Sequence, residues 1–397
     1  MSEENKPQND KPRFVGEWVR LGDVLEKTFS GEWGVEEGEL LTPVLRTSNF
    51  NEDGTFDYET PAMRCIPAKK IEAKRMLRGD IVLEKSGGTP KRPVGIMAYY
   101  DSDDLALCSN FNQVLRFDKG VVDSKYAFYQ LRWLKERGAF RQFTRKTTGL
   151  QNLQMKKFVD LKLLRPPLEE QKKISSQFDA IAAQIAHAEV QIEKFDQLVK
   201  SRFVEMFDAV ERYECLGDLG LIVTGNTPSK KNASYYEGRD IPFFKPGDFA
   251  GSKVSRLVSS ANYISNEAKE TARILPKDSV LVTCIGTIGK VGVLAEEAAF
   301  NQQINGIVPY KTKCLSRYLA QAILLNANSL IDASNAVTVA IVNKSTFSKM
   351  VVPVPPLCVQ QGFCDFARSV DKPRFAIQQQ IEKLEMLKAS LMQEYFG

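Results

Sequence analysis

The stretch Pro166-Pro167-Leu168-Glu169-Glu170-Gln171 has a counterpart 189 residues later, Pro355-Pro356-Leu357-Cys358-Val359-Gln360. A long run of mixed polar and apolar residues follows each of them. Proline does not continue a regular strand, but it is tolerated in the first turn of a helix, where its missing N–H is not needed. Both stretches therefore predict the start of a long helix, one in mid-chain and one near the C-terminus.

Further residues of the two long stretches match at the same offset. Gln191–Lys194 matches Gln380–Lys383, and Phe207 matches Phe396. A repeated tripeptide also precedes each stretch: Leu21-Gly22-Asp23 corresponds to Leu216-Gly217-Asp218. The chain is therefore a duplicated unit in the order globule, long helix, globule, long helix, and it offers two similar surfaces that suit a divided target.

The repeat sets the predicted domain bounds. We expect a disordered tail at 1–13, a first globular domain at 14–165, a long helix at 166–209, a second globular domain at 210–353 and a C-terminal long helix at 354–397. The first segment is assigned as a tail because it is polar and charged and has no apolar signal core.

Both globular domains show short apolar runs broken by Gly, Pro, Asn and Asp, which predicts mixed α and β structure. In the first domain we expect strands at 80–83, 94–97 and 113–117, and a helix at 124–137 with Ser124 as its N-cap. In the second domain we expect strands at 279–283 and 306–308, and a helix at 315–331.

Each long helix carries apolar residues in steps that alternate four and three, which is a heptad seam. The first seam is Ile174, Phe178, Ile181, Ile185, Ala188, Ile192, Phe195 and Val199, and the matching positions are Phe363, Ala367, Val370, Arg374, Ile377, Ile381, Leu384 and Lys388. We expect the seams to pair as an antiparallel coiled coil, with Pro373 kinking or interrupting the second helix. The alternative is that each helix packs only on its own globular domain.

The composition is ordinary for a globular protein. Of 397 residues, 43% are hydrophobic and 26% are charged, and the formal net charge is +5. No apolar run approaches the ~18 residues of a membrane helix, so no membrane association is expected. Seven cysteines without a C-x-x-C pair indicate reduced thiols and a cytoplasmic protein. We expect most of them to serve as small buried hydrophobic residues.

Several kinds of active site are excluded by the sequence. The single histidine, His187, falls inside the first long helix, where we expect it on the surface, so that no Ser-His-Asp triad, His-rich metal site or zincin motif can form. The segment 286–291 has the wrong spacing for a phosphate loop. Arg165 and Val354 precede the Pro-Pro pairs, where amino-methyltransferases carry Asn or Asp. We therefore predict no catalytic residue, no metal site and no cofactor.

Polar and basic residues instead gather in loops of both globular domains. Arg, Lys, Asn and Gln are the side chains that read base edges, while Lys, Ser and Thr hold phosphates. One such loop alone is more often a solvated turn, but recurrence in both halves favours a DNA interface. The predicted DNA-binding residues of the first domain are Lys85, Ser86, Thr89, Lys91, Arg92, Asn112, Gln113, Arg141, Arg145 and Lys146. Those of the second are Thr227, Ser229, Lys230, Lys231, Tyr236, Lys245, Thr287, Lys290, Asn301 and Gln302.

With these features the chain resembles the specificity (S) subunits of type I restriction–modification enzymes over nearly its whole length. The paired Pro-Pro-Leu-x-x-Gln openings and the paired Leu-Gly-Asp segments carry most of the resemblance. Gly225–Ser229, Tyr236, Ile241–Phe243 and Gly247-Asp248 look like the start of a recognition domain of this family, and Gly286–Lys290 with Asn301-Gln302 looks like its later part. The second helix departs from the family pattern at Cys358-Val359 and at Pro373.

The resemblance implies an α+β fold in which two similar, mixed α/β target recognition domains are separated by two long helices that form an antiparallel coiled coil, with a pseudo-two-fold internal repeat. Each domain would read one half of a split, asymmetric site in double-stranded DNA. The helices would dock two methyltransferase (M) subunits, and nuclease/translocase (R) subunits would join them. S-adenosylmethionine would then bind in M, and ATP and Mg²⁺ in R.

Two other classes of function remain open from the residues alone. One is a methyltransferase or nuclease fragment with its own chemistry, which the missing cofactor loop disfavours. The other is a coiled-coil scaffold that binds no nucleic acid, which the basic loops disfavour.

Overall fold

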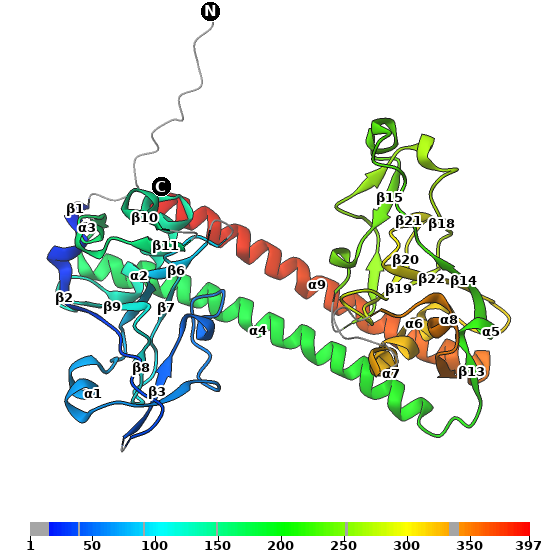
Figure 1. Ribbon diagram of the computed structural model, residues 1–397, viewed down its shortest axis with the longest axis horizontal. Coiled ribbons are helices and arrows are strands. Elements are labelled where there is room, and N and C mark those ends of the chain that lie inside the picture. The colour runs from blue at the N-terminus through cyan, green and yellow to red at the C-terminus, as the bar shows by residue number, and fades with distance from the viewer. Residues whose placement is uncertain (1–15, 39, 90–91, 148–149, 251–252, 333–340) are drawn as a thin grey trace, which may run out of the picture. The chain divides into compact units, whose positions relative to one another are not determined.

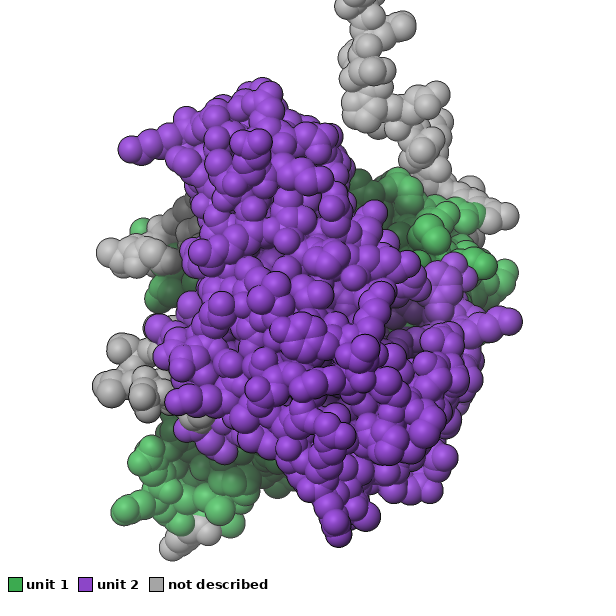
Figure 2. All heavy atoms as spheres, turned by 90° about the vertical axis from the view of Figure 1, so that its right-hand side faces the viewer, with its two compact units in different colours: residues 1–186, 381–397 green, residues 187–380 purple. Residues whose placement is uncertain are grey.

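The computed structural model describes residues 16–38, 40–89, 92–147, 150–250, 253–332 and 341–397. The predicted tail at 1–13 and Lys91 lie outside these ranges. The chain divides into two compact units, unit 1 of residues 1–186 and 381–397 and unit 2 of residues 187–380, which Figure 2 colours separately. The two long helices, α4 (Leu168–Phe207) and α9 (Leu357–Phe396), therefore each contribute one part to unit 1 and one part to unit 2.

Unit 1 is built around a four-stranded antiparallel sheet in the order β2-β9-β5-β7. A separate three-stranded sheet has the order β4-β3-β8. Two smaller sheets, β1-β12 and β10-β11-β6, complete the unit. Its strands are β1 (Glu17–Arg20), β2 (Leu25–Ser30), β3 (Leu41–Leu45), β4 (Ala62–Cys65), β5 (Ile81–Glu84), β6 (Ser86–Gly88), β7 (Met97–Tyr99), β8 (Leu107–Cys108), β9 (Asn112–Phe117), β10 (Thr144–Thr147), β11 (Leu150–Leu153) and β12 (Lys162–Arg165). Its shorter helices are η1 (Leu21–Val24), η2 (Thr47–Asn49), α1 (Ala68–Lys74), α2 (Ser124–Glu136), η3 (Ala139–Phe143) and α3 (Met155–Phe158).

Among its described residues, unit 2 repeats the two larger sheets and the β1-β12 pair of unit 1, adds the strands β16 and β18, and has no sheet that corresponds to β10-β11-β6. Its sheets are β14-β22-β19-β20-β16, β17-β15-β21-β18 and β13-β23. The strands are β13 (Tyr213–Cys215), β14 (Gly220–Thr224), β15 (Ile241–Phe244), β16 (Ser255–Leu257), β17 (Tyr263–Ile264), β18 (Ile274–Leu275), β19 (Val280–Thr283), β20 (Val291–Leu294), β21 (Ala298–Phe300), β22 (Ile304–Pro309) and β23 (Val351–Pro353). The shorter helices are α5 (Leu216–Leu219), η4 (Ala233–Tyr236), η5 (Pro246–Asp248), η6 (Asn266–Ala268), α6 (Ser316–Leu325), α7 (Ala327–Asp332) and α8 (Lys344–Ser348).

The internal repeat predicted from sequence is confirmed in the two larger sheets of each unit. β14-β22-β19-β20 corresponds to β2-β9-β5-β7, and β15, which pairs antiparallel with β17 and parallel with β21, corresponds to β3 between β4 and β8. The sequence echo Leu-Gly-Asp becomes η1 in unit 1 and α5 in unit 2. The mixed α/β composition predicted for both globular domains is therefore confirmed, together with the two long helices.

A glycine stands at the same place in both copies of the fold, directly after β2 and β14. A Cβ atom on Gly31 would lie 2.1 Å from the carbonyl oxygen of Cys108, and one on Gly225 would lie 2.2 Å from that of Asn301. Only glycine allows the backbone of the first strand to approach the segment after β8 or β21 this closely.

Each long helix completes a core with its apolar seam. In unit 1 the Phe178 ring of α4 stacks at 6.0 Å from the Phe396 ring of α9, so the beginning of one helix meets the end of the other. In unit 2 Phe203 of α4 packs edge-on against Phe363 of α9 at 5.2 Å. The pairing is thus antiparallel, as predicted, and Figure 1 shows α4 in green and α9 in red as the two long helices.

The Gln that ends each Pro-Pro-Leu-x-x-Gln motif is fully buried and ties the start of its helix to the preceding α/β domain. Gln171 accepts a hydrogen bond from the Asp123 amide at 2.9 Å and donates to the Pro166 carbonyl at 2.8 Å. Gln360 accepts from the Leu315 amide at 2.9 Å and donates to the Pro355 carbonyl at 2.9 Å. The motif therefore fixes where each long helix begins relative to α2 or α6.

Of the two expectations for Pro373, the interruption is wrong, because α9 runs without a break from Leu357 to Phe396, and the kink stays a prediction. Proline removes one backbone donor, but ion pairs hold the helix on both sides of it. Asp371 binds Arg317 of α6 at 2.6 Å, and Arg374 binds Asp196 of α4 at 3.1 Å. Tertiary contacts therefore outweigh the local preference of proline.

Three local predictions are corrected by the structure. The side chain that caps α2 is that of Asp123, which accepts a hydrogen bond from the Tyr126 amide, and not that of Ser124. The helix predicted at 315–331 is two helices, because the side chain of Asn326 donates to the Ala322 carbonyl at 2.9 Å and ends α6. The strand predicted at 94–97 starts only at Met97, since Gly95 has a φ of +102°.

The predictions for cysteine and histidine are largely confirmed. Five cysteines are buried, Cys215 is half-buried and Cys358 is exposed. Burial raises the pKa of the Cys108 and Cys314 thiols to about 12, so they remain protonated and inert. His187 is exposed on α4, where its ring nitrogen lies 2.9 Å from the side-chain amide of Gln191.

Candidate nucleic-acid interface

In unit 1 the two basic segments predicted to bind DNA come together in one small sheet. β10 pairs with β11, and β11 pairs with β6, so that Arg145 lies opposite Asn152, and Asn152 lies opposite Ser86. Arg141 and Arg145 are exposed, Ser86 is half-buried, and Lys146 lies in β10 one residue from Arg145. Segments that are about sixty residues apart in the sequence therefore present cationic and polar groups side by side.

Lys85 and Gln113 form a hydrogen-bonded group at the end of the main sheet. The Lys85 ammonium donates to the Ser30 hydroxyl and, at 3.4 Å, to the side-chain oxygen of Gln113. Gln113 in turn donates to the Thr28 hydroxyl at 2.9 Å. Partial burial lowers the pKa of Lys85, because desolvation disfavours the charged form. These side chains are positioned by one another as well as by the strands.

A cavity of about 420 Å³ opens beside this group in unit 1. Arg92 is one of its lining residues; the Arg92 amide donates to the Thr89 hydroxyl at 3.1 Å, and the Arg92 guanidinium binds Glu84 at 2.6 Å. The cavity is lined by Trp33, Arg46, Thr47, Ser48, Glu84, Ser86, Gly87, Arg92, Ser109, Asn110 and Phe111. Asn112, predicted to meet DNA, is instead fully buried behind it and accepts from the Thr47 hydroxyl at 2.9 Å.

In unit 2 the predicted residues of the 227–236 loop meet those after β21. The Thr227 hydroxyl donates to the side-chain oxygen of Gln302 at 2.6 Å, and the Tyr236 hydroxyl donates to the Pro228 carbonyl at 2.6 Å. Asn301 is buried and bonds to Gln303 at 2.9 Å. Ser229, Lys230 and Lys231 stay exposed. The two lysine ammonium groups therefore point to solvent from a loop whose ends are held by the hydrogen bonds of Thr227 and Tyr236.

The other predicted cations of unit 2 are engaged within the fold. The Lys245 ammonium donates to the side chain of Asn262 at 2.6 Å, and the Lys290 ammonium donates to the Phe249 carbonyl at 3.2 Å. Both lysines are half-buried, whereas Thr287 is exposed. Lys245 and Lys290 thus stabilise the region after β15 by hydrogen bonds within the unit, and their ammonium groups are less available for DNA than those of Lys230 and Lys231.

Sequence reasoning missed the residues that the repeat places at the same edge. Arg46 follows β3 as Lys245 follows β15, and each begins a 3-10 turn that is closed by a side chain three residues later, Asn49 or Asp248. Glu84, Trp33 and Phe111 were also missed. Lys245 was predicted, and an alignment of the two halves of the chain, extended from the long helices into the strands, would have added Arg46 as its counterpart.

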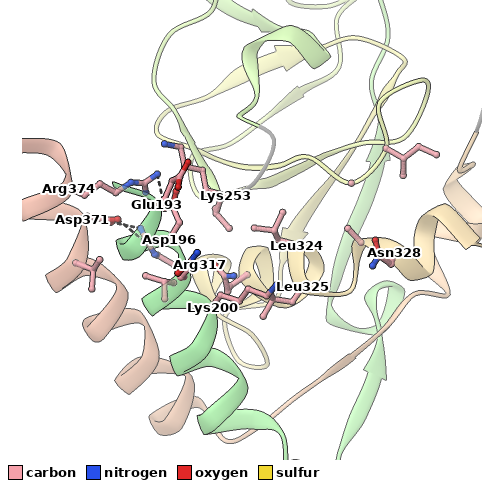
Figure 3. A pocket seen from close by; sticks show the side chains of 18 residues that line it. Glu193, Asp196, Lys200, Lys253, Arg317, Leu324, Leu325, Asn328, Asp371 and Arg374 are labelled. Carbon is pink, nitrogen blue, oxygen red and sulfur yellow. Dashed lines mark hydrogen bonds and ion pairs between the residues drawn. The ribbon is translucent and has the colours of Figure 1, made fainter. Parts of the chain in front are cut away.

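A second cavity, of about 590 Å³, lies in unit 2 among α4, α6, α7 and α9 (Figure 3). Its charged groups neutralise one another, since Arg317 forms a bidentate pair with Asp371 and Arg374 pairs with Asp196. Burial raises the pKa of Asp196 and lowers that of Lys253. These contacts tie three helices together, and they leave no strong excess of either charge for a ligand.

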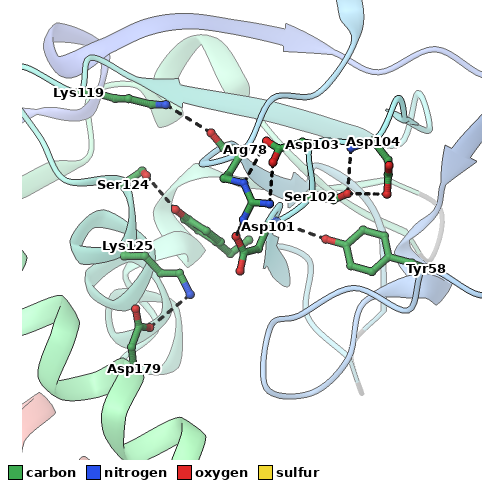
Figure 4. Close-up of polar contacts among 11 residues, drawn as sticks. Tyr58, Arg78, Asp101, Ser102, Asp103, Asp104, Lys119, Ser124, Lys125 and Asp179 are labelled. Carbon is green, nitrogen blue, oxygen red and sulfur yellow. Dashed lines mark hydrogen bonds and ion pairs between the residues drawn. The ribbon is translucent and has the colours of Figure 1, made fainter.

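An acidic cluster of unit 1 is also internally compensated. Arg78 donates to both oxygens of Asp103, at 3.0 and 2.9 Å, and also bonds to Asp101 (Figure 4). The nearby Lys125 pairs with Asp179 of α4 at 3.3 Å. Within the described ranges, no three His, Cys, Asp or Glu side chains are grouped so that they could hold a metal ion.

None of the helices in the described part of the chain is both long and apolar enough to cross a membrane.

Comparison with known proteins identifies the family. The model of the type I restriction modification DNA specificity domain matches the chain twice, at residues 17–194 and 211–386. The putative type I restriction enzyme MjaX specificity subunit of Methanocaldococcus jannaschii is 21% identical over 419 residues, which cover 98% of this chain and 95% of that protein. The type I restriction enzyme HindI specificity subunit of Haemophilus influenzae is 35% identical over 150 residues, which cover 36% of this chain and 31% of the Haemophilus protein.

Solved structures show the same fold. The crystal structure of a type I restriction–modification S subunit from M. genitalium superposes with a TM-score of 0.59 at 14% identity, covering 100% of this chain and 99% of that one. Two matches of one specificity domain, on a fold with two equivalent halves, agree with the predicted duplication. The chain therefore belongs to the family of type I restriction modification DNA specificity proteins, whose members are the DNA-recognition subunits of type I restriction enzymes and not their catalytic subunits.

Proposed function

We propose that the chain reads a split, asymmetric site in double-stranded DNA, with one half-site for each recognition domain. The observation that carries this proposal is the duplicated fold with exposed polar and basic segments in both units. β6, β10 and β11 present Arg145 and Ser86 in unit 1, and the loop with Lys230 and Lys231 stands on Gln302 in unit 2. The recognition domains comprise residues 14–165 and 210–353.

The long helices are proposed to dock two methyltransferase subunits. Several large apolar side chains of α4 and α9 are exposed, among them Phe375 at 65% and Val190 at 47% in unit 2 and Met386 at 64% in unit 1. Apolar side chains on a helix face that its own unit does not cover are typical of a protein interface. Nuclease/translocase subunits would join this assembly in the cytoplasm, and S-adenosylmethionine, ATP and Mg²⁺ would bind in the partner subunits.

Exchange of residues 14–165 for the first recognition domain of another family member tests the division of labour. We expect the hybrid, expressed with its methyltransferase partner, to change one half of the methylated motif and keep the other half, because each domain carries its own loops. Sequencing of modified bases in the host genome is the measurement. A hybrid in which both halves changed together would refute independent recognition.

The double variant Lys230→Ala/Lys231→Ala tests the exposed loop of unit 2. Each lysine that contacts a phosphate should contribute about one unit to the slope of log affinity against log salt concentration, so the variant should lower that slope and weaken all DNA sequences alike. Binding by the complex with the methyltransferase subunit is measured over a salt series. Lys311→Ala/Lys349→Ala is the control, because these exposed lysines adjoin Tyr310 and Met350, whose backbones bond to Leu219 and Leu216 ahead of the start of β14. An unchanged slope in the first variant would remove this loop from the interface.

A further inference from the structure

Glu84 is a buried carboxylate that the fold leaves half satisfied. The side chain ends β5 with 1% of its surface exposed, and it lines the 420 Å³ cavity of unit 1. One oxygen, Oε1, accepts from Arg92 at 2.6 Å, while Oε2 is buried with no hydrogen-bond partner among the described residues. Burial raises the pKa of Glu84, and the Arg92 guanidinium and the nearby Gly95 amide oppose that shift, although the amide makes no hydrogen bond of normal geometry to Oε2. A buried acceptor without a donor is costly, so its presence calls for an explanation.

The repeat shows that the fold itself does not need this carboxylate. Glu84 lies opposite Asn112 across β5 and β9, and the equivalent pair across β19 and β22 is Thr283 opposite Ile304. The Thr283 hydroxyl is satisfied, because it accepts from the Lys290 amide at 3.0 Å. The same backbone position is therefore occupied in unit 2 by a small residue with a complete hydrogen bond. The carboxylate therefore belongs to the first recognition domain and not to the fold that the two domains share.

The residues around Glu84 suit a DNA base as the ligand of the cavity better than a small ion. Phe111, 56% exposed, and Trp33 give the cavity aromatic walls, against which a base can stack. Exposed Arg145 of β10 lies in the sheet that contains β6, which begins two residues after Glu84, and exposed Arg92 binds Glu84 itself, so cationic groups that could hold a DNA backbone border this region. An ionised carboxylate accepts hydrogen bonds only, so its natural partner is a donor on the base edge.

We propose that Glu84 determines one position of the half-site read by unit 1 by accepting a hydrogen bond from an exocyclic amino group, the N4 amino group of cytosine or the N6 amino group of adenine. In the major groove these amino groups are the donors of the base edges, whereas guanine O6 and thymine O4 are acceptors that a carboxylate repels. The carboxylate thus favours cytosine or adenine by attracting the amino group and disfavours guanine or thymine by repelling the carbonyl oxygen. Arg92 orients Glu84 through Oε1 and leaves Oε2 for the base. The proposal rests on the proposed function, in which unit 1 reads one half-site.

The test is Glu84→Gln in the full chain, assembled with its methyltransferase subunit. The substitution keeps the shape of the side chain and replaces one acceptor oxygen by a donor NH₂ group. We expect discrimination at one base pair of one half-site to fall by about 5- to 150-fold, the equivalent of one mismatched base pair, with the other half-site unchanged. Methylated-motif sequencing and binding to a panel of single-base-pair variants measure this change.

Arg92→Met separates base reading from support of the loop. This variant removes the ion pair that orients Glu84 but keeps the acceptor, so it should weaken binding to every sequence and reduce the base preference less than Glu84→Gln does. If Glu84→Gln and Arg92→Met both lowered the melting temperature and neither changed the motif, Glu84 would be structural and the inference would be overturned.

A measurement on the unmodified protein keeps the inference testable if Glu84→Gln does not fold. Each cytosine or adenine of both half-sites is replaced in turn by the analogue that lacks the exocyclic amino group. One position in the half-site of unit 1 should lose about 5- to 150-fold in affinity. If no position were sensitive although the complex bound its site specifically, the role of Glu84 would fail while the proposed function stood. If the complex bound no sequence specifically, the proposed function itself would fail.

Discussion

Gly225→Ala is expected to destabilise unit 2 by about 3 kcal/mol or more. The new Cβ would lie 2.2 Å from the carbonyl oxygen of Asn301 and 2.4 Å from that of Phe300, distances that no relaxed structure allows. The backbone cannot move aside, because the Gly225 amide donates to the Ile304 carbonyl at 3.0 Å and the next amide donates to the Phe300 carbonyl at 3.0 Å. The end of β14 would separate from the segment after β21, which carries Gln302.

Urea unfolding of the full chain and amide hydrogen exchange of peptides from β14 and β21 measure this effect. Gly31→Ala should do the same to unit 1, where the Cβ would meet the Cys108 carbonyl at 2.1 Å. Gly247→Ala is the matched control, since no atom lies within 4 Å of its added Cβ, and its effect should be within about 0.5 kcal/mol. A Gly225→Ala protein with the unfolding midpoint of the unmodified chain would contradict the assigned approach of these strands.

Gln360→Met is expected to cost about 2–5 kcal/mol of stability in unit 2. Methionine has a similar length but offers neither donor nor acceptor to the groups that Gln360 now satisfies. These are the Leu315 amide at 2.9 Å, the Lys313 carbonyl at 3.1 Å and the Pro355 carbonyl at 2.9 Å. Each partner left unsatisfied in a buried place costs about 1–3 kcal/mol, reduced where water can reach it.

The neighbouring Gln361 supplies the control for this substitution. It is exposed and bonds only to Asp365 one turn along α9, at 2.9 Å, so Gln361→Met should change the free energy of unfolding by less than about 0.5 kcal/mol. Thermal unfolding of both variants is the measurement, and Gln171→Met should repeat the larger effect in unit 1. Equal melting temperatures for the two variants at 360 and 361 would show that the buried Gln does not hold the start of α9.

These two predictions also show what could be predicted from the sequence and what could not. The Pro-Pro-Leu-x-x-Gln pair located both long helices and the internal repeat, because proline position and heptad spacing are local and periodic signals. The role of Gln171 and Gln360 was not predicted, since it depends on amides some 45 residues away in sequence, at Asp123 and Leu315. The continuation of α9 through Pro373 was likewise decided by the pairs of Asp371 and Arg374 with other helices.

The candidate interface was predicted in part for the same reason. Loop composition identified exposed cations such as Arg145 and Lys230, whose chemistry is evident residue by residue. It could not show that Asn112 is buried, that Lys245 and Lys290 are bound within the fold, or that Glu84 borders a cavity. Such facts arise from strand register and from contacts between segments distant in the sequence.

The packing of the last turns of α9 has a consequence for the order in which the protein is made. Met392, Tyr395 and Phe396 belong to the core of unit 1, and the Phe396 carbonyl accepts a hydrogen bond from the Trp133 indole at 3.0 Å. All residues of unit 2 lie between 187 and 380 and leave the ribosome before these three. The recognition domain that is translated first is therefore completed last, and during synthesis it must wait with part of its aromatic core uncovered while the second domain folds.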